Sequence, residues 1–158
     1  MKALVFGQSG QVAQELARRL PAGVSATLLG RGQADLDDPD ACAAAVMTSD
    51  ADVVINAAAY TAVDRAETDE AQALLVNGAA PGAMARAAAV KGLPFVHIST
   101  DYVFDGAGAR PWEEDDPVAP LGAYGATKLD GERQVAAAGG RHMILRTAWV
   151  YAARGQNF

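Results

Sequence analysis

The chain has 158 residues, of which 51% are hydrophobic and 20% are charged, with a formal net charge of −6 at pH 7. This length and composition predict one globular domain with a substantial core and exclude a disordered or fibrous protein. The scattered acidic charge gives no basis for nucleic-acid binding, and no apolar stretch approaches the roughly 18 uninterrupted residues of a bilayer span, so we expect no nucleic-acid or membrane partner.

Strand-like runs alternate with alanine-rich helical segments along the chain. Several of the runs are continuously apolar, as in strands that are buried on both faces of a parallel sheet. The alternation predicts an α/β fold, a doubly wound parallel sheet of Rossmann type. The expected strands are residues 3–6, 25–29, 52–56, 93–98 and 142–146, and the expected helices are 11–20, 39–48, 69–91 and 121–138. Pro81 and Gly82 should break the third helix into two pieces, with Asn77 capping the second.

The first strand and the single cysteine bear on the compartment. The chain opens directly on strand-like residues 2–6, without the basic, apolar and small-residue sections that make up a signal peptide. Cys42 excludes an internal disulfide, and its place in the second helix predicts that it packs as a small hydrophobe. Both features favour the cytoplasm.

The turn after the first strand has the spacing of a dinucleotide-binding loop. Gly7 permits a tight turn, Gly10 lets the backbone approach a pyrophosphate at the helix N-terminus, and Ala13 takes the position of a third glycine. A simple glycine turn is the alternative, but the position at the start of a βαβ unit favours NADPH or NADH as a ligand.

The end of the second strand bears on the choice of dinucleotide. Arg31 stands where an NAD-binding chain would have an acidic residue, and it could pair with a 2′-phosphate or be a solvated loop cation. NADPH is therefore slightly favoured over NADH. Asp35 and Leu36 could flank an adenine ring, or Asp35 could cap a turn.

Small residues follow the third strand. Ala57, Ala58 and Ala59 leave room for a cofactor lying across the sheet, although ordinary packing between strand and loop would also use them.

Three side chains further along suggest carbonyl reduction. Thr100 and Asp101 end the apolar run of the fourth strand, and Tyr124 and Lys128 stand one helical turn apart downstream. A phenol exchanges protons poorly at neutral pH unless a cation stabilises its phenolate. Lys128 can supply that cation, and Thr100 can orient the oxygen that the phenol protonates.

Four blocks of sequence, residues 6–12, 52–67, 97–106 and 124–128 together with 146–151, resemble the N-terminal part of the dTDP-4-dehydrorhamnose reductases, a family of extended short-chain dehydrogenase/reductases. The resemblance implies that NAD(P)H reduces the C4 ketone of a nucleotide-linked 6-deoxyhexose to give dTDP-L-rhamnose.

The resemblance also implies individual roles. Tyr124 would donate the proton, Lys128 would bind the nicotinamide ribose, and Thr100 would bind the substrate oxygen. Asp101 and Trp149 would lie near the sugar, although Trp149 could instead be a core aromatic. The positions implied to line the cofactor are Gly10, Gln11, Val12, Ala59, Tyr60 and Thr61.

Other polar residues have plainer interpretations. His97 is expected to be a buried structural histidine with its hydrogen bonds satisfied. Asp64 and Glu67 could be an acidic pair at a helix N-terminus. The acidic run 113–116 is expected to be a solvated loop. A role in binding Mg²⁺ is possible there but not supported, because no ligand geometry is fixed.

In the family it resembles, Phe158 lies in the middle of the protein. We therefore expect residues 1–158 to be an incomplete NAD(P)-binding Rossmann domain, with the substrate domain absent or supplied by a partner. The strand at 142–146 would then be an exposed edge, and little turnover is expected from the chain alone. A homodimer is left open.

Two other functions compete with reduction. One is a non-catalytic dinucleotide-binding regulatory subunit, and the other is an epimerase or dehydratase acting on a sugar nucleotide. The complete set of Thr100, Tyr124 and Lys128 argues for chemistry. Dehydratases have an Asp-Glu pair after the active-site hydroxyl, whereas Asp101 and Tyr102 follow it here, which favours simple reduction.

Overall fold

The computed structural model describes residues 1–153 and contains one five-stranded parallel sheet with the strand order β2-β1-β3-β4-β5. The strands are β1 Lys2–Phe6, β2 Ser25–Leu29, β3 Val53–Asn56, β4 Phe95–Thr100 and β5 His142–Thr147. All five predicted strands are confirmed, with ends that differ by at most two residues. The α/β, Rossmann-like fold is confirmed with them.

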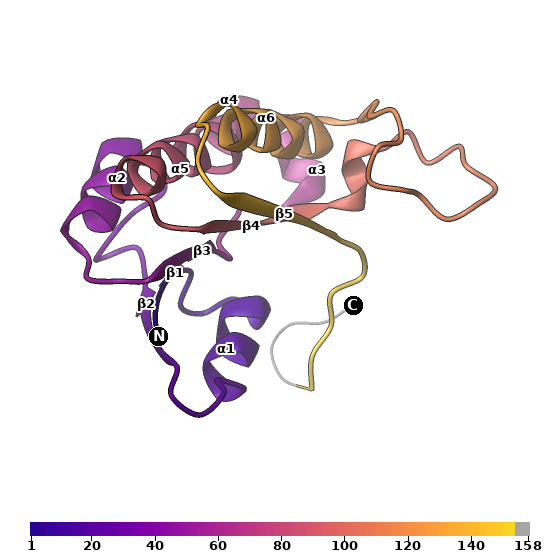
Figure 1. Ribbon diagram of the computed structural model, residues 1–158. Helices are drawn as coiled ribbons and strands as arrows, with labels where there is room; N and C mark the ends of the chain where they lie inside the picture. Colours follow the sequence, from indigo (N-terminus) through magenta and orange to yellow (C-terminus); the bar gives the residue numbers. More distant parts are fainter. Residues whose placement is uncertain (154–158) are drawn as a thin grey trace.

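The helices lie in two layers (Figure 1). Their bounds are α1 Gln11–Arg18, α2 Pro39–Thr48, α3 Val63–Ala66, α4 Glu70–Leu74, α5 Ala80–Lys91 and α6 Ala123–Ala137, with a π-helical turn, η1, at Leu75–Ala79 and a 3₁₀ turn, η2, at Asp101–Val103. The connection from β1 to β2 runs in the opposite direction across the sheet to the later ones. Because each crossover is right-handed, α1 covers one face and the other α-helices cover the opposite face.

The core is divided between these layers. The larger cluster packs α2 and α5 on the sheet and includes Phe6, Val54, Met84 and Phe95, which are at most 2% exposed. A smaller cluster forms around Ala13 of α1. Cys42 is fully buried in the larger cluster, as predicted, and burial raises the pKa of its thiol to about 12.

The predicted break at Pro81 and Gly82 is wrong. Helical structure continues from α4 through η1 into α5, and Pro81 stands in the first turn of α5, where a proline ring is tolerated. The irregularity lies just before it, in the π-helical turn. Asn77 is 1% exposed inside that turn and does not cap a helix.

The same continuous stretch is the one candidate membrane span among residues 1–153. Residues 70–91 are long and apolar enough to cross a bilayer by length and composition, but 67% of the tested window is buried inside the fold. Burial of that degree is typical of the core helix of a globular domain.

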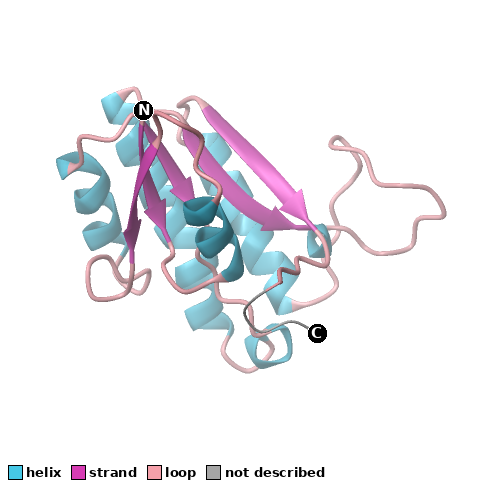
Figure 2. Ribbon diagram, turned by 90° about the horizontal axis from the view of Figure 1, so that it is seen from below, coloured by secondary structure: helices cyan, strands magenta, loops and turns pink. Residues whose placement is uncertain are grey.

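The last described strand is an edge of the sheet, as predicted. β5 pairs only with β4 among residues 1–153, and Met143 and Leu145 on it are 56% and 42% exposed. Figure 2 shows the sheet from the side on which α1 lies. On that face α1 crosses the described sheet, and no helix covers β5.

Candidate active site

The turn after β1 requires glycine. The backbone amide of Gly7 donates to the Leu29 carbonyl oxygen at 3.0 Å, and its φ of +116° lies in the region that residues with a side chain rarely adopt. A Cβ at this position would lie 3.3 Å from the backbone carbonyl group of Ala57. The carboxyl ends of β1, β2 and β3 therefore meet tightly at this residue.

The N-terminus of α1 suits a phosphate group. The N-cap residue Gly10 supplies no capping side chain, and the first turn carries no acidic residue, so the positive end of the helix is not neutralised there. A Cβ on Gly10 would meet no atom within 4 Å, so the backbone is accessible to a ligand. The loop fits the pyrophosphate of a dinucleotide, with Gln11 and Val12 in the first turn.

The loop after β3 is held by a residue whose role sequence reasoning missed. Asn77 Oδ1 accepts from the Tyr60 backbone amide at 2.9 Å, and Asn77 Nδ2 donates to the Tyr60 carbonyl oxygen at 3.1 Å and to Thr127 Oγ1 at 3.2 Å. The Tyr60 hydroxyl donates to Asp69. Ala57, Ala58, Ala59 and Tyr60 are half-buried and Thr61 is exposed. The signal in the sequence is an asparagine within an apolar helix, but its role is to hold this loop and not to cap a helix.

Of the three residues after β2 that were expected to bind the cofactor, Arg31 is exposed and Leu36 is buried. Arg31 is exposed in the turn at 31–33. The Asp35 carboxylate accepts from the Asp37 backbone amide at 3.2 Å, which is the turn-capping alternative. Leu36 is 8% exposed and packs in the larger core cluster, so little of its side chain is available to an adenine ring.

The reactive hydroxyl groups meet at the carboxyl end of β4. Thr100 Oγ1 accepts from the Tyr102 amide at 3.2 Å and donates to Asp101 Oδ1 at 3.1 Å. Burial raises the pKa of Tyr124, and its hydrogen bond with Thr100 opposes that shift only in part. The phenol therefore keeps its proton at neutral pH. The Tyr124 ring packs edge-on against Tyr102, with centroids 5.6 Å apart.

Lys128 lies one turn further along α6 and is 2% exposed. Its Nζ donates to the Ile98 carbonyl oxygen at 2.7 Å and lies 3.5 Å from His97 Nε2. Burial lowers the pKa of Lys128 to about 8, with the nearby Glu132 carboxylate opposing the shift. His97 is fully buried and has partners at both ring nitrogens, as predicted for a structural histidine.

Contacts at its N-terminus place α6 against the end of β4. A Cβ on Gly125 would lie 2.2 Å from the Tyr102 carbonyl oxygen, so only glycine allows this approach. Glu67 Oε1 accepts from the Ala123 amide at 2.8 Å. The expectation for the acidic pair is thus half wrong, because Asp64 lies in the first turn of α3 but Glu67 follows α3 and caps α6.

Trp149 is not a core aromatic. It is 74% exposed and has a φ of +50°. It follows β5 two residues after Thr147, whose register partner is Thr100, so the topology brings Trp149 to the same end of the sheet as the reactive hydroxyl groups.

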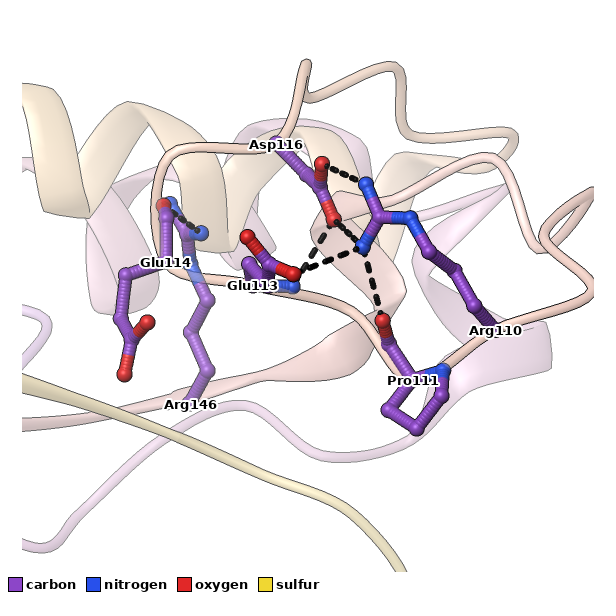
Figure 3. A network of polar contacts seen from close by, with 6 residues as sticks. All are labelled: Arg110, Pro111, Glu113, Glu114, Asp116 and Arg146. Atoms are coloured by element: carbon purple, nitrogen blue, oxygen red, sulfur yellow. Dashed lines mark hydrogen bonds and ion pairs between the residues drawn. The ribbon is translucent and has the colours of Figure 1, made fainter.

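Glu113, Glu114 and Asp115 of the acidic run are exposed, as expected of a solvated loop, but the loop is also anchored by two arginines (Figure 3). Arg110 donates to both oxygens of Asp116, at 3.0 and 2.5 Å. Arg146 of β5 donates to the Glu114 carbonyl oxygen at 3.1 Å and pairs with Glu132 of α6 at 2.7 Å. Among residues 1–153, no three His, Cys, Asp or Glu side chains gather as a metal site.

Two hollows lie near the sheet. One of about 350 Å³ is bounded by α1, residues 19–21 and residues 150–152. A larger one of about 560 Å³ lies between β2 and α2, away from Tyr124 and Lys128. We place the candidate site by its side-chain chemistry, because neither hollow is lined by the reactive residues.

Known proteins are similar to this chain in sequence and fold. The reductase of Burkholderia thailandensis named dTDP-4-dehydrorhamnose reductase is 53% identical over the whole chain, and the enzyme of that name from Escherichia coli K12 is 43% identical. The chain covers 53% and 54% of these two proteins, so it spans about half the length of the curated relatives it matches.

Solved structures agree. A dTDP-4-dehydrorhamnose reductase from Clostridium acetobutylicum superposes with a TM-score of 0.94 at 40% identity, over 100% of this chain and 56% of that one. The enzyme from Bacillus anthracis, solved in complex with NADP, gives 0.94 at 30% identity, over 99% of this chain and 56% of that one. The family model described as the RmlD substrate binding domain matches residues 1–158, and the chain belongs to that family.

Proposed function

We propose that this chain carries the cofactor site and the catalytic residues of an NAD(P)H-dependent reductase that converts dTDP-4-dehydro-L-rhamnose to dTDP-L-rhamnose. One observation carries the proposal: Thr100, Tyr124 and Lys128 gather at the carboxyl end of β4, on the edge of the sheet where the glycine loop also lies. Relatives that share the whole chain bear the name of this activity.

The chain's own residues divide the work. Thr100 would bind the ketone oxygen of the sugar, and the protonated phenol of Tyr124 would donate its proton to that oxygen as general acid. Lys128 would bind the ribose and stabilise the phenolate left behind. Asp101 and Trp149 would contact the sugar. A bound nicotinamide cofactor supplies the hydride.

The glycine loop supports a dinucleotide, and Arg31 would select its form. An exposed guanidinium at the tip of β2 can pair with a 2′-phosphate. We expect Arg31→Ala to weaken NADPH binding several-fold and to leave NADH binding unchanged, as measured by cofactor fluorescence. Equal losses for both cofactors would contradict a contact between Arg31 and the 2′-phosphate.

The proposed function has consequences for domain organisation, location and partners. Residues 1–158 would be the NAD(P)-binding part of a longer enzyme, and the sequence that relatives have in addition would hold the nucleotide sugar. The chain would act in the cytoplasm without a membrane or nucleic-acid partner. The exposed apolar side chains of Met143 and Leu145 on the edge strand β5 support a contact there, either with a second copy of the chain in a homodimer or with another part of the longer enzyme.

Tyr124→Phe tests the reaction. In the full-length protein the variant should bind NADPH as the wild type does and lose about 10²- to 10⁴-fold in the rate of NADPH oxidation with the ketosugar. Retained activity would contradict the role of the phenol. The 158-residue chain alone should bind NADPH with little turnover, and rapid turnover by it would contradict the proposed division into two parts.

A further inference from the structure

A row of buried polar side chains crosses the sheet beneath α6, and the proposed reaction uses only its last member. Asn56 ends β3, His97 is its register partner on β4, and Lys128 lies above them on α6. All three are at most 2% exposed. Buried polar groups have to satisfy one another, so the direction of each hydrogen bond in this row can be worked out.

The direction is fixed at one end by the backbone. The Ala58 amide can only donate, and it donates to Asn56 Oδ1 at 3.1 Å. Asn56 Nδ2 therefore faces His97 Nδ1, at 3.2 Å. Because an amide NH₂ group can only donate, Nδ1 has to be the acceptor, and neutral His97 carries its proton on Nε2.

The other ring nitrogen faces the lysine. His97 Nε2 lies 3.5 Å from Lys128 Nζ, which also donates to the Ile98 carbonyl oxygen at 2.7 Å. An ammonium has three donors and no acceptor, so it would meet the Nε2–H donor to donor. A neutral amine has a lone pair that can accept this hydrogen while it donates to Ile98.

We propose that Asn56 and His97 are positioning residues for Lys128, and that they form a directed chain from the Ala58 amide to Lys128 Nζ which favours the neutral amine in the chain without ligands. In the proposed reaction Lys128 would stabilise the Tyr124 phenolate as an ammonium, so it would there have to hold the proton that this chain of hydrogen bonds disfavours; this consequence rests on the proposed function. The hydrogen-bond chain itself does not rest on it.

The charges around Lys128 are consistent with this. Glu132, one turn along the same helix, favours the ammonium, but Arg146 of β5 holds that carboxylate at 2.7 Å and offsets its charge. On β4, burial and the lysine both lower the pKa of His97, so the imidazole stays neutral. Tyr124, one turn back, is a protonated phenol at neutral pH. Lys128 thus becomes able to gain or lose a proton near neutral pH.

Asn56→Asp tests the direction of the chain with little change of shape. The carboxylate can still accept from the Ala58 amide, but its second oxygen would now accept from His97 Nδ1–H. The bare Nε2 would then accept from the lysine. We expect ¹⁵N NMR of the 158-residue chain to show the Nε2–H tautomer of His97 in the wild type and the Nδ1–H tautomer in the variant. The pKa of Lys128, followed by ¹³Cε NMR, should rise by about one unit, a tenfold shift in its protonation equilibrium.

Asn77→Asp is the matched control, since it adds the same charge at another buried asparagine that bonds Tyr60 and Thr127. Its His97 tautomer should stay Nε2–H. An Nδ1–H or doubly protonated His97 in the wild type would overturn the proposal, and that measurement needs no variant to fold. An unchanged tautomer in folded Asn56→Asp would also overturn it. Neither readout needs turnover, so a chain with this proton arrangement that fails to bind NADPH would refute the proposed function alone.

Discussion

Removing the carboxylate of Glu67 should loosen the start of the helix that carries Tyr124. The first amides of α6 have no partner within the helix, and its N-cap residue Gly122 has no side chain to offer. Glu67 Oε1 accepts from the Ala123 amide at 2.8 Å and places a negative charge at the positive end of the helix. Losing a capping acceptor costs about 0.5–2 kcal/mol, and because Glu67 is exposed we expect about 1 kcal/mol for Glu67→Ala.

Urea unfolding of the 158-residue chain measures this loss directly, and the accompanying fall in Tm should be about 2–4 °C. Glu67→Gln should lose less than Glu67→Ala, because its amide oxygen can still accept the hydrogen bond. Asp64→Ala is the control, since this acid lies in α3 and should change the free energy of unfolding by less than about 0.5 kcal/mol. Equal stabilities of Glu67→Ala and Asp64→Ala would refute the capping argument.

Two further variants test buried charges. Burial lowers the pKa of Lys128 from 10.5 to about 8 in the folded chain. Between these two pH values the unfolded chain therefore holds more protons than the folded chain. The free energy of unfolding should rise with pH over this range, by up to about 3 kcal/mol. Lys128→Met should lack this rise when unfolding free energies at pH 7.5 and 10 are compared, and parallel pH curves for the two proteins would contradict it. Arg146→Met should lose about 3 kcal/mol, because the Glu132 side chain is only 6% exposed and would be left without its partner. Adding Glu132→Leu should recover much of that loss in chemical denaturation, and a further loss would show that the pair itself is not the cause.

The strands could be predicted because each is a short apolar run rich in β-branched residues or leucine that alternates with a longer alanine-rich segment, and length separates strands from helices in such a chain. The third helix shows the limit of the same reasoning. Pro81 normally marks a helix end, but here it stands in the first turn of α5, directly after a π-helical turn, and the helical structure continues through it. Whether a proline ends a helix or stands in the first turn of one depends here on packing against α6, and no local sequence pattern contains that information.

The candidate site divides in the same way. Gly7, Gly10, Thr100, Tyr124 and Lys128 could be found because their spacing along the chain matches a chemical need. Their supporting partners could not. Asn56 meets His97 through strand register, and Glu67 meets Ala123 across 56 positions of sequence. Such pairs form between residues far apart in the sequence, so they depend on the topology of the fold and no local sequence pattern predicts them.

The π-helical turn at Leu75–Ala79 has a consequence for how this sequence can change in length. A π turn contains one residue more than an α turn, and here the wider turn contains Asn77, whose side chain clamps both backbone groups of Tyr60. Deleting a single residue from this turn would leave an uninterrupted α-helix, rotate the asparagine away and release the loop that follows β3. Substitutions on the exposed side of α4 should be tolerated, whereas insertions or deletions of one residue between 75 and 79 should be selected against.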